Sequence, residues 1–421
     1  MEEAFFVNGG KELFGKVELH GAKNAVLPML AASLLTDEEV EIKDCPSISD
    51  VDNMLELVRE VGGEVFRFGR NIRVRGQAVK NSVSTSLQKV MRSSMFMLGT
   101  LLATVGEVKT SLPGGCAIGG RPLDIHLDGL KMLGATCQEI GDEIFCRAKE
   151  LKGAKIVMRY PSVGATENLL LASCKAKGKT TLINCAREPE IVSLVGLLNN
   201  MGAKIRGEGT SVLEIDGVES LHGASFTPVA DRIVGGTLLS ALSVCGGEIE
   251  ICGLDERLVG STLCALRSKN FETFDDGLCL RARAKKVTDC SEEVACDLTT
   301  GPYPLFATDM QPIVSAVKCF GKGVSRIRET VFESRFSHLS EMKKLGANVK
   351  IDGDVALLSR GDLRAGDMRA RDLRGGAGLL VFALGLAGES RIFGTSFVKR
   401  GYENIDETMR KLGADMRIIK N

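Results

Sequence analysis

Leu412-Gly413-Ala414-Asp415-Met416 is the stretch that decides the fold, because close copies of it recur along the chain. In each copy an apolar helical pattern ends at a glycine, and a short strand pattern follows. A glycine at this position can end a helix in the left-handed conformation without a Cβ clash. The other copies are Val61-Gly62-Gly63-Glu64-Val65, Leu133-Gly134-Ala135-Thr136, Met201-Gly202-Ala203-Lys204-Ile205 and Leu345-Gly346-Ala347-Asn348-Val349.

The spacing of these copies predicts a repeat protein. Gly63, Gly134 and Gly202 are 71 and 68 residues apart, and Gly346 and Gly413 are 67 residues apart. The 144 residues between Gly202 and Gly346 leave room for one degenerate copy. Its expected elements are a helix at 239–244, a strand at 246–251 and a second helix at 263–271. We therefore predict an α/β fold of six repeats of about 70 residues each.

The composition excludes several classes of function. The 421 residues include 54 Lys and Arg, 54 Asp and Glu, three Tyr and no Trp, which argues against nucleic-acid binding. The longest apolar stretches, such as 379–387, are shorter than the roughly 18 residues of a membrane span. The opening Met-Glu-Glu lacks the basic segment of a secretory signal. We expect a cytoplasmic protein of two or three domains with no nucleic-acid or membrane partner.

The thirteen cysteines are scattered, and many of them lie in apolar runs. No Cys-x-x-Cys pair occurs, and Cys290 and Cys296 are poorly spaced for zinc. The histidines also lack the spacing of metal ligands; they are His20, His126, His222 and His338. We therefore expect reduced thiols and no metal site.

The segment from His20 to Pro28 places Lys23 and Asn24 after a glycine turn and before a helical pattern. A helix N-terminus attracts anions, so these two side chains could bind an anionic ligand. A solvated lysine at a helix start is the alternative interpretation.

The segment from Leu112 to Asp124 is a glycine-rich loop around Cys116. It lacks the Lys and Ser/Thr of a phosphate-binding P-loop. A thiol among glycines and close to Arg121 would have a lowered pKa and be reactive. A surface loop with an unreactive cysteine is the alternative.

The segment from Pro302 to Gln311 leads into a helix, and its prolines predict an extended backbone. Asp309 could act as a general base. Alternatively, Thr308 or Asp309 could simply cap the helix.

Arg374 and Arg400 are each followed by glycine, which would let a small anion approach without crowding. Arginine binds carboxylates through two parallel hydrogen bonds. Ordinary surface ion pairs are the alternative. Arg92 precedes an apolar run at a helix start, where the helix dipole disfavours a cation, and this misfit also suggests an anionic ligand.

Taken together, the motifs of the chain resemble a known family. They are GAKNAVLP, LPGGCAIGGRPLD, PSVGATEN, REPEI, TDMQP, ETVFESRF, DLRGG and RGYE, and they occur in this order. The chain resembles the UDP-N-acetylglucosamine 1-carboxyvinyltransferases, a branch of the enolpyruvyl transferase family, from about residue 5 to residue 418. The cysteine loop distinguishes this branch from the shikimate-pathway enolpyruvyl transferases.

The resemblance implies an inside-out α/β barrel of six βαβαββ-like repeats in two similar domains. One domain would span 22–229 and carry the cysteine loop. The other would combine 1–21 with 230–421, and the active site would lie in the cleft between them.

The resemblance also implies the reaction and the residues. The enolpyruvyl group of phosphoenolpyruvate would be transferred to UDP-N-acetylglucosamine by addition and elimination, opening peptidoglycan synthesis, with no cofactor or metal. Asp309 would deprotonate the sugar hydroxyl or relay its proton. Cys116 would be the general acid at the methylene carbon or assist product release, could form a covalent adduct with phosphoenolpyruvate, and would be the target of fosfomycin. Lys23, Arg92 and Arg121 would bind the phosphate, Arg374 and Arg400 the carboxylate, and Asn24 the sugar. The binding site of the nucleotide sugar would be lined by Arg121, Pro122, Leu123, Asp124, Ile125, Ser162, Val163, Gly164 and Val331.

The chain departs from the family pattern at two places. Leu305 and Ala307 stand where glycine and proline are expected, which could shift Asp309. The glycine-rich stretch 374–378 could loosen the helix that carries Arg374. Three alternatives remain: a shikimate-pathway transferase, a non-catalytic protein that binds UDP-sugar, and a thiol redox protein that uses Cys116.

Overall fold

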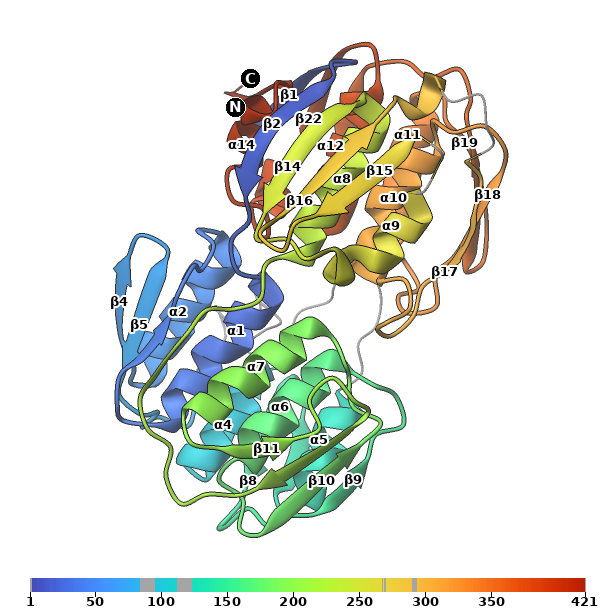
Figure 1. Cartoon of the computed structure of the whole chain (residues 1–421). Helices are drawn as coiled ribbons and strands as arrows, with labels where there is room; N and C mark the ends of the chain where they lie inside the picture. Colours follow the sequence, from blue (N-terminus) through green and yellow to red (C-terminus); the bar gives the residue numbers. More distant parts are fainter. Residues whose placement is uncertain are drawn as a thin grey trace. The chain divides into compact units, whose positions relative to one another are not determined.

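The computed structural model describes residues 2–83, 95–111, 123–266, 268, 270–289 and 294–420 (Figure 1). These residues form two compact units, with boundaries between His20 and Gly21 and between Val229 and Ala230. We name the unit within 21–229 the central unit. The unit built from 2–20 and 230–420 contains both ends of the described chain, and we name it the terminal unit.

Each unit contains helices and short strands in alternation. The central unit contains α1 (Lys23–Ala32), β3 (Val40–Ile42), α2 (Ser49–Val61), β4 (Glu64–Phe68), β5 (Asn71–Arg75), α4 (Phe96–Thr104), β6 (Glu107–Ser111), α5 (Asp124–Met132), β7 (Thr136–Ile140), β8 (Glu143–Arg147), β9 (Lys155–Val157), α6 (Val163–Ser173), β10 (Lys179–Ile183), α7 (Pro189–Asn200), β11 (Lys204–Arg206), β12 (Val212–Asp216) and β13 (Ala224–Phe226). The terminal unit contains β1 (Glu3–Gly9), β2 (Leu13–Glu18), α8 (Arg232–Cys245), β14 (Gly247–Cys252), α9 (Gly260–Leu266), β15 (Phe271–Asp275), β16 (Cys279–Ala284), β17 (Asp297–Thr299), the 3-10 turn η5 (Thr308–Met310), α10 (Gln311–Lys318), β18 (Ser325–Arg328), α11 (Ser337–Lys344), β19 (Asn348–Asp352), β20 (Val355–Ser359), β21 (Asp367–Arg369), α12 (Leu373–Gly385), β22 (Gly388–Phe393), α13 (Thr395–Val398), α14 (Ile405–Lys411) and β23 (Asp415–Lys420).

Five of the six sheets have the same topology. These five have four strands, in the orders β13-β3-β5-β4, β11-β12-β10-β9, β15-β16-β14-β2, β17-β18-β20-β19 and β21-β22-β1-β23. Each of these five combines one parallel pair with two antiparallel pairs. The sixth, β6-β8-β7, has three antiparallel strands, and a parallel bridge between Ser82 and Lys109 stands where the fourth strand would pair. The repeated topology agrees with the six predicted repeats.

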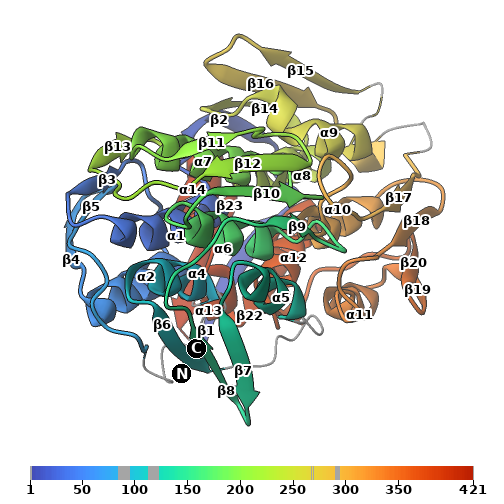
Figure 2. The same cartoon turned by 90° about the horizontal axis from the view of Figure 1, so that it is seen from below.

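Helices form the centre of each unit's hydrophobic core. In α6, α8 and α12 nearly every residue is buried, which is typical of a helix that is apolar all round. α8 packs against β14 and β16, and α12 packs against α8 and α10 (Figures 1 and 2). The cores of the two units consist of separate clusters of apolar side chains.

The glycines of α12 allow close packing instead of loosening the helix as the sequence suggested. α12 is continuous from Leu373 to Gly385. A Cβ on Gly378 would lie 2.5 Å from the carbonyl oxygen of Pro312, and one on Gly376 would lie 2.6 Å from a methyl group of Val398. Only glycine permits this approach, so Gly378 lets the helix of Arg374 pack against α10 and Gly376 lets it pack against α13.

The repeat junctions are formed as predicted. Gly134, Gly202, Gly346 and Gly413 all have φ between 91° and 96°. In the first repeat the left-handed residue is Gly62, with φ of 122°, and not Gly63. In the degenerate repeat the second helix is shorter than expected, because α9 ends at Leu266 and Phe271 begins β15.

We expect Gly346→Ala to destabilise the protein far more than Gly413→Ala. Their φ angles are 96° and 91°, so alanine at either position costs about 1–2 kcal/mol for the left-handed conformation. At Gly346 the new Cβ would also lie 1.8 Å from the carbonyl oxygen of Asp362, whereas at Gly413 the nearest atom is 3.7 Å away. Overpacking adds about 1–3 kcal/mol. Urea unfolding of the two variants measures the difference, and equal losses would contradict this account.

One cysteine pair contradicts the expectation of reduced thiols. Cys252 and Cys279 form a disulfide, although 27 residues separate them. They lie directly opposite each other on β14 and β16. Sequence spacing could not reveal this pair, because the register of two strands is set by their tertiary pairing.

Among the described residues, the structure has no helix that is both long and apolar enough to cross a membrane.

Candidate active site

Lys23 is the first residue of α1 and is buried. Its Nζ lies 2.9 Å from Oδ2 of Asp50, in the first turn of α2, and both side chains are at most one tenth exposed. The alternative of a solvated lysine is therefore wrong. A buried ion pair at the start of α1 can hold an ammonium in place for an anion, while the neighbouring Asn24 is partly exposed.

The expected nucleotide-sugar residues of the central unit lie at the starts of two helices. Leu123, Asp124 and Ile125 are at the start of α5. Ser162, Val163 and Gly164 are at the start of α6, where the Ser162 hydroxyl accepts a hydrogen bond from the amide of Ala165.

Two contacts bring these helix starts together. Arg159 forms an ion pair with Asp124. A Cβ on Gly164 would lie 3.4 Å from the ring of His126 in α5. His126 is buried, and its Nδ1 lies 3.2 Å from Nδ2 of Asn168. The two segments thus lie side by side, and we call their two helix N-termini, with the polar side chains of Asp124, Arg159 and Ser162, the polar surface.

Four of the predicted site residues lie outside the described part of the chain: Arg92, Cys116, Arg121 and Pro122. Their predicted roles stay predictions.

Asp309 lies in η5, at the entrance to α10, and is held by two arginines. Its Oδ1 accepts a hydrogen bond of 2.8 Å from Nη2 of Arg335. Its Oδ2 accepts a hydrogen bond of 3.0 Å from Nε of Arg374, and Nη2 of Arg374 lies 2.9 Å from the same oxygen in an ion pair. Both arginines are buried, whereas the Asp309 side chain remains 28% exposed. The carboxylate is therefore fixed in orientation and still accessible.

The backbone before Asp309 differs from the predicted extended segment. Residues 302–305 form a turn that contains a cis Tyr303–Pro304 peptide bond. Ala307 is the residue that precedes η5, so neither Thr308 nor Asp309 caps the helix, and that alternative is wrong.

Glu329 is a buried carboxylate that sequence reasoning missed. It accepts hydrogen bonds of 2.9 Å from the hydroxyls of Thr300 and Thr308, and of 2.8 Å from the amide of Val331. It thereby ties η5 to the segment that carries Val331. Arg335 was missed as well. Both residues belong to the motif ETVFESRF, and that motif was the signal that could have pointed to them.

Arg374 combines burial with strong electrostatic interactions. Burial lowers its pKa, but Asp309, Tyr402 and Asp231 outweigh this effect and raise the pKa above its ordinary value. Its guanidinium carbon lies 5.6 Å from the ring centre of Tyr402. The buried Nη1 of Arg374 and Nε of Arg335 make no hydrogen bond with any described residue. Such N–H groups can donate hydrogen bonds to an anionic ligand.

Arg400 lies between α13 and α14, two residues before Tyr402, and is partly exposed. Since Tyr402 packs on Arg374, the chain places Arg400 on a segment adjoining the Asp309 cluster.

Three carboxyl groups of the central unit form a buried group that sequence reasoning also missed. Glu167 is in α6, Glu188 precedes α7, and Glu190 is in its first turn. Burial, followed by repulsion from Glu190 and Glu188, raises the pKa of Glu167 well above its ordinary value of 4.5. Its Oε1 has no hydrogen-bond partner among the described residues.

We expect Glu167→Gln to stabilise the protein above pH 4.5. In the unfolded chain Glu167 loses its proton near pH 4.5, whereas in the folded chain it keeps the proton to a higher pH. Unfolding therefore releases a proton in this window, and stability falls by up to about 1.4 kcal/mol per pH unit. Glutamine removes this loss. Urea unfolding at pH 5 and pH 8 should show a smaller decline for the variant than for the wild type, and parallel declines would refute the assignment.

Comparisons with known proteins cover the whole chain. The family profile described as EPSP synthase (3-phosphoshikimate 1-carboxyvinyltransferase) matches residues 7–409. UDP-N-acetylglucosamine 1-carboxyvinyltransferase 2 of Caldanaerobacter subterraneus subsp. tengcongensis is 40% identical over 98% of both chains. UDP-N-acetylglucosamine 1-carboxyvinyltransferase of Halothermothrix orenii is 39% identical over 99% of both.

Two solved structures share the fold. The enolpyruvyl transferase NikO from Streptomyces tendae has a TM-score of 0.87 and 24% identity, covering 100% of this chain and 99% of its own. EPSP synthase from Acinetobacter baumannii has a TM-score of 0.76 and 15% identity, covering 99% of this chain and 100% of its own.

Proposed function

Because the chain belongs to the enolpyruvyl transferase family, we propose that it transfers the enolpyruvyl group of phosphoenolpyruvate to the 3-hydroxyl of UDP-N-acetylglucosamine, releasing phosphate. This reaction is the first committed step of peptidoglycan synthesis. We choose UDP-N-acetylglucosamine as the acceptor because the chain is 39–40% identical, over nearly its full length, to relatives named for this reaction.

In the central unit, we assign phosphate binding to Lys23, with Arg92 and Arg121. The 2.9 Å ion pair with Asp50 supports the assignment of Lys23, because it holds the ammonium at the start of α1. Asn24 would orient the sugar. The polar surface formed by the starts of α5 and α6, with Arg121 and Pro122, would hold the nucleotide sugar, together with Val331 of the terminal unit.

In the terminal unit, we assign carboxylate binding to Arg374 and Arg400. The unpartnered Nη1 of Arg374 supports this assignment, because a buried guanidinium N–H without a partner favours an anionic acceptor. Asp309, held by Arg335 and Arg374, would accept the proton of the sugar hydroxyl.

The proposed steps conserve protons and bonds. Asp309 takes the proton of the 3-hydroxyl as its oxygen attacks C2 of phosphoenolpyruvate, and Cys116 supplies a proton to C3. The tetrahedral intermediate then returns a proton from C3 to the Cys116 thiolate and expels phosphate, whose departing charge Lys23, Arg92 and Arg121 would stabilise.

The finer architecture is part of the same proposal. The common topology of the sheets and the buried central helices support two inside-out barrels, formed by 22–229 and by 1–21 with 230–421. Residues of both would act on the substrates. We also propose a cytoplasmic location, because both substrates are charged metabolites.

A phosphate-release assay tests this proposal. Phosphate should appear when phosphoenolpyruvate is supplied with UDP-N-acetylglucosamine and not when it is supplied with shikimate 3-phosphate. Release with shikimate 3-phosphate alone would favour the shikimate-pathway alternative. Binding of UDP-N-acetylglucosamine without phosphate release would favour a non-catalytic protein.

We expect fosfomycin, an epoxide that resembles phosphoenolpyruvate, to alkylate Cys116 before any other thiol. Burial raises the pKa of competing thiols, including Cys45, Cys174 and Cys245, to about 12, which leaves little thiolate at neutral pH. Cys264 is exposed, so it provides the comparison. Peptide mapping should find the label in Cys264→Ser and lose it in Cys116→Ser. Labelling at Cys264 in the wild type would contradict the prediction.

A further inference from the structure

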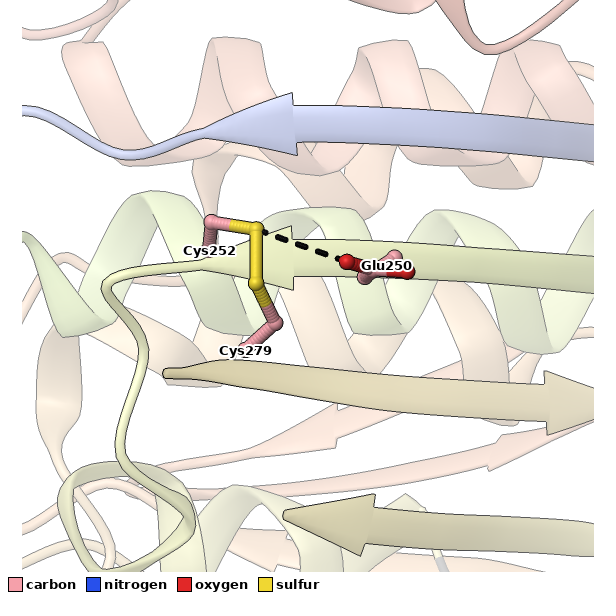
Figure 3. Close-up of side chains that lie close together, drawn as sticks. All are labelled: Glu250, Cys252 and Cys279. Carbon is pink, nitrogen blue, oxygen red and sulfur yellow. Dashed lines mark hydrogen bonds between the residues drawn. A yellow bond between two sulfur atoms is a disulfide. The ribbon is translucent and has the colours of Figure 1, made fainter. Parts of the chain in front are cut away.

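Cys252, Cys279 and Glu250 form a compact group on the sheet β15-β16-β14-β2, outside the candidate active site (Figure 3). One ligand atom from each residue, two sulfurs and a carboxylate oxygen, lies within 4.8 Å of the other two. Among the described residues, no other group of three His, Cys, Asp or Glu side chains has its ligand atoms this close together. The two sulfurs are joined in the disulfide, and the Cys252 sulfur lies 3.7 Å from Oε1 of Glu250.

The strand register explains why these side chains share one face. Ile249 and Ile251 of β14 point into the core, so Glu250 and Cys252 point away from it. Glu250 lies opposite Lys16 of β2 and Arg281 of β16.

The next row across the same strands contains Glu18, Cys252 and Cys279. Glu18 is exposed and occupies the register position opposite Cys252. Both carboxylate-bearing positions thus adjoin Cys252, Glu18 across the strands and Glu250 along β14, while Cys279 is buried beside it.

We propose that, when the disulfide is reduced, Cys252, Cys279 and Glu250 bind a thiophilic divalent metal ion such as Zn²⁺. A dithiol reductant gives two electrons and two protons to the pair: its own thiols become a disulfide, and the Cys252–Cys279 bond is broken. Each thiol then releases its proton to solvent as its sulfur binds the ion. Zn²⁺ prefers four tetrahedral ligands from sulfur, nitrogen and carboxylate oxygen. Glu18 or a water molecule would supply the fourth.

The charges around the group favour this occupant. Two thiolates and one carboxylate carry three negative charges, one more than a divalent ion neutralises. Lys16 lies 2.6 Å from Oε1 of Glu250, and Arg281 lies 3.5 Å from Oε2. These cations hold the carboxylate in place, as groups around metal ligands commonly do, and their two positive charges leave the reduced group with one net negative charge before an ion binds.

A second cysteine pair provides a matched control. Cys137 and Cys146 lie directly opposite each other on β7 and β8, and neither is in a disulfide. Within the described chain they lack a third ligand at the spacing found around Cys252. If metal binding requires Glu250, the ion should bind at Cys252 and Cys279 and not at Cys137 and Cys146.

Titration of the dithiol-reduced, full-length protein with Co²⁺ tests the proposal, because thiolate ligation of Co²⁺ gives charge-transfer and visible absorption bands. We expect these bands at one ion per chain, displaced by Zn²⁺. Cys252→Ser should abolish them, Glu250→Gln should weaken binding by about tenfold or more, and Cys137→Ser should leave binding unchanged. The oxidised protein should give no bands.

Three outcomes would overturn the proposal: no thiolate bands after reduction, a disulfide that the reductant leaves intact, or bands in Cys252→Ser equal to those of the wild type. Circular dichroism of Cys252→Ser and Glu250→Gln checks that loss of binding is not loss of folding. None of these measurements uses enolpyruvyl transfer, so the result is independent of the proposed function.

Discussion

Asp309→Asn is expected to lower turnover by about 10²–10⁴, which corresponds to roughly 3–5 kcal/mol of transition-state stabilisation. The amide retains the shape of the carboxylate and can still accept a hydrogen bond from Arg335 or Arg374. It cannot accept the proton of the sugar hydroxyl. Phosphate release measures turnover, and calorimetric titration should find that UDP-N-acetylglucosamine still binds.

Asp354→Asn is the matched control for Asp309→Asn. Asp354 also accepts a hydrogen bond from an arginine of the terminal unit, Arg328, at 2.7 Å, but this pair is about half exposed. The control should keep near-normal turnover, since exposed ion pairs contribute little. If Asp309→Asn behaved like the control, the proton would have to be taken by another group.

Lys23→Met is expected to damage both stability and activity. Removing one partner of a buried ion pair costs about 3–5 kcal/mol, and the side chains of Lys23 and Asp50 are only 10% and 4% exposed. Loss of the ammonium should also reduce turnover by at least about tenfold, because the departing phosphate loses a charge that stabilises it. Urea unfolding and phosphate release measure the two effects.

The double variant Lys23→Met with Asp50→Asn separates these effects. Removing the buried carboxylate together with its partner should restore much of the stability. Turnover should stay low, because the phosphate still lacks its ammonium. Recovery of both properties together would mean that Lys23 serves only to stabilise the fold.

The repeated glycine junctions predicted the six repeats because a helix end depends on its own few residues. A glycine at φ near 96°, as at Gly134 and Gly346, performs the same local task wherever it occurs. Lys23, a candidate residue at a helix start, could be predicted for the same reason, whereas Ser162 came from the resemblance to the family. Each lies within a short motif that specifies the end of an element.

Whether Lys23 is solvated or buried in an ion pair could not be predicted from the sequence. A lysine at a helix start is compatible with solvent or with burial, and only the packing of α1 against α2 places Asp50 beside Lys23. The glycines after Arg374 suggested a loosened helix, because the neighbour that requires them, Pro312, lies on another helix.

The repeats, the helix ends and the charged residues of the site could be predicted from short stretches of sequence. These features depend on φ preferences and periodicity over a few residues. Only the tertiary structure decided that Asp309 meets Arg335 and Arg374, which are 26 and 65 residues away, and that Cys252 meets Cys279. Such contacts depend on helix packing and strand register, which arise when whole elements bury their apolar faces together.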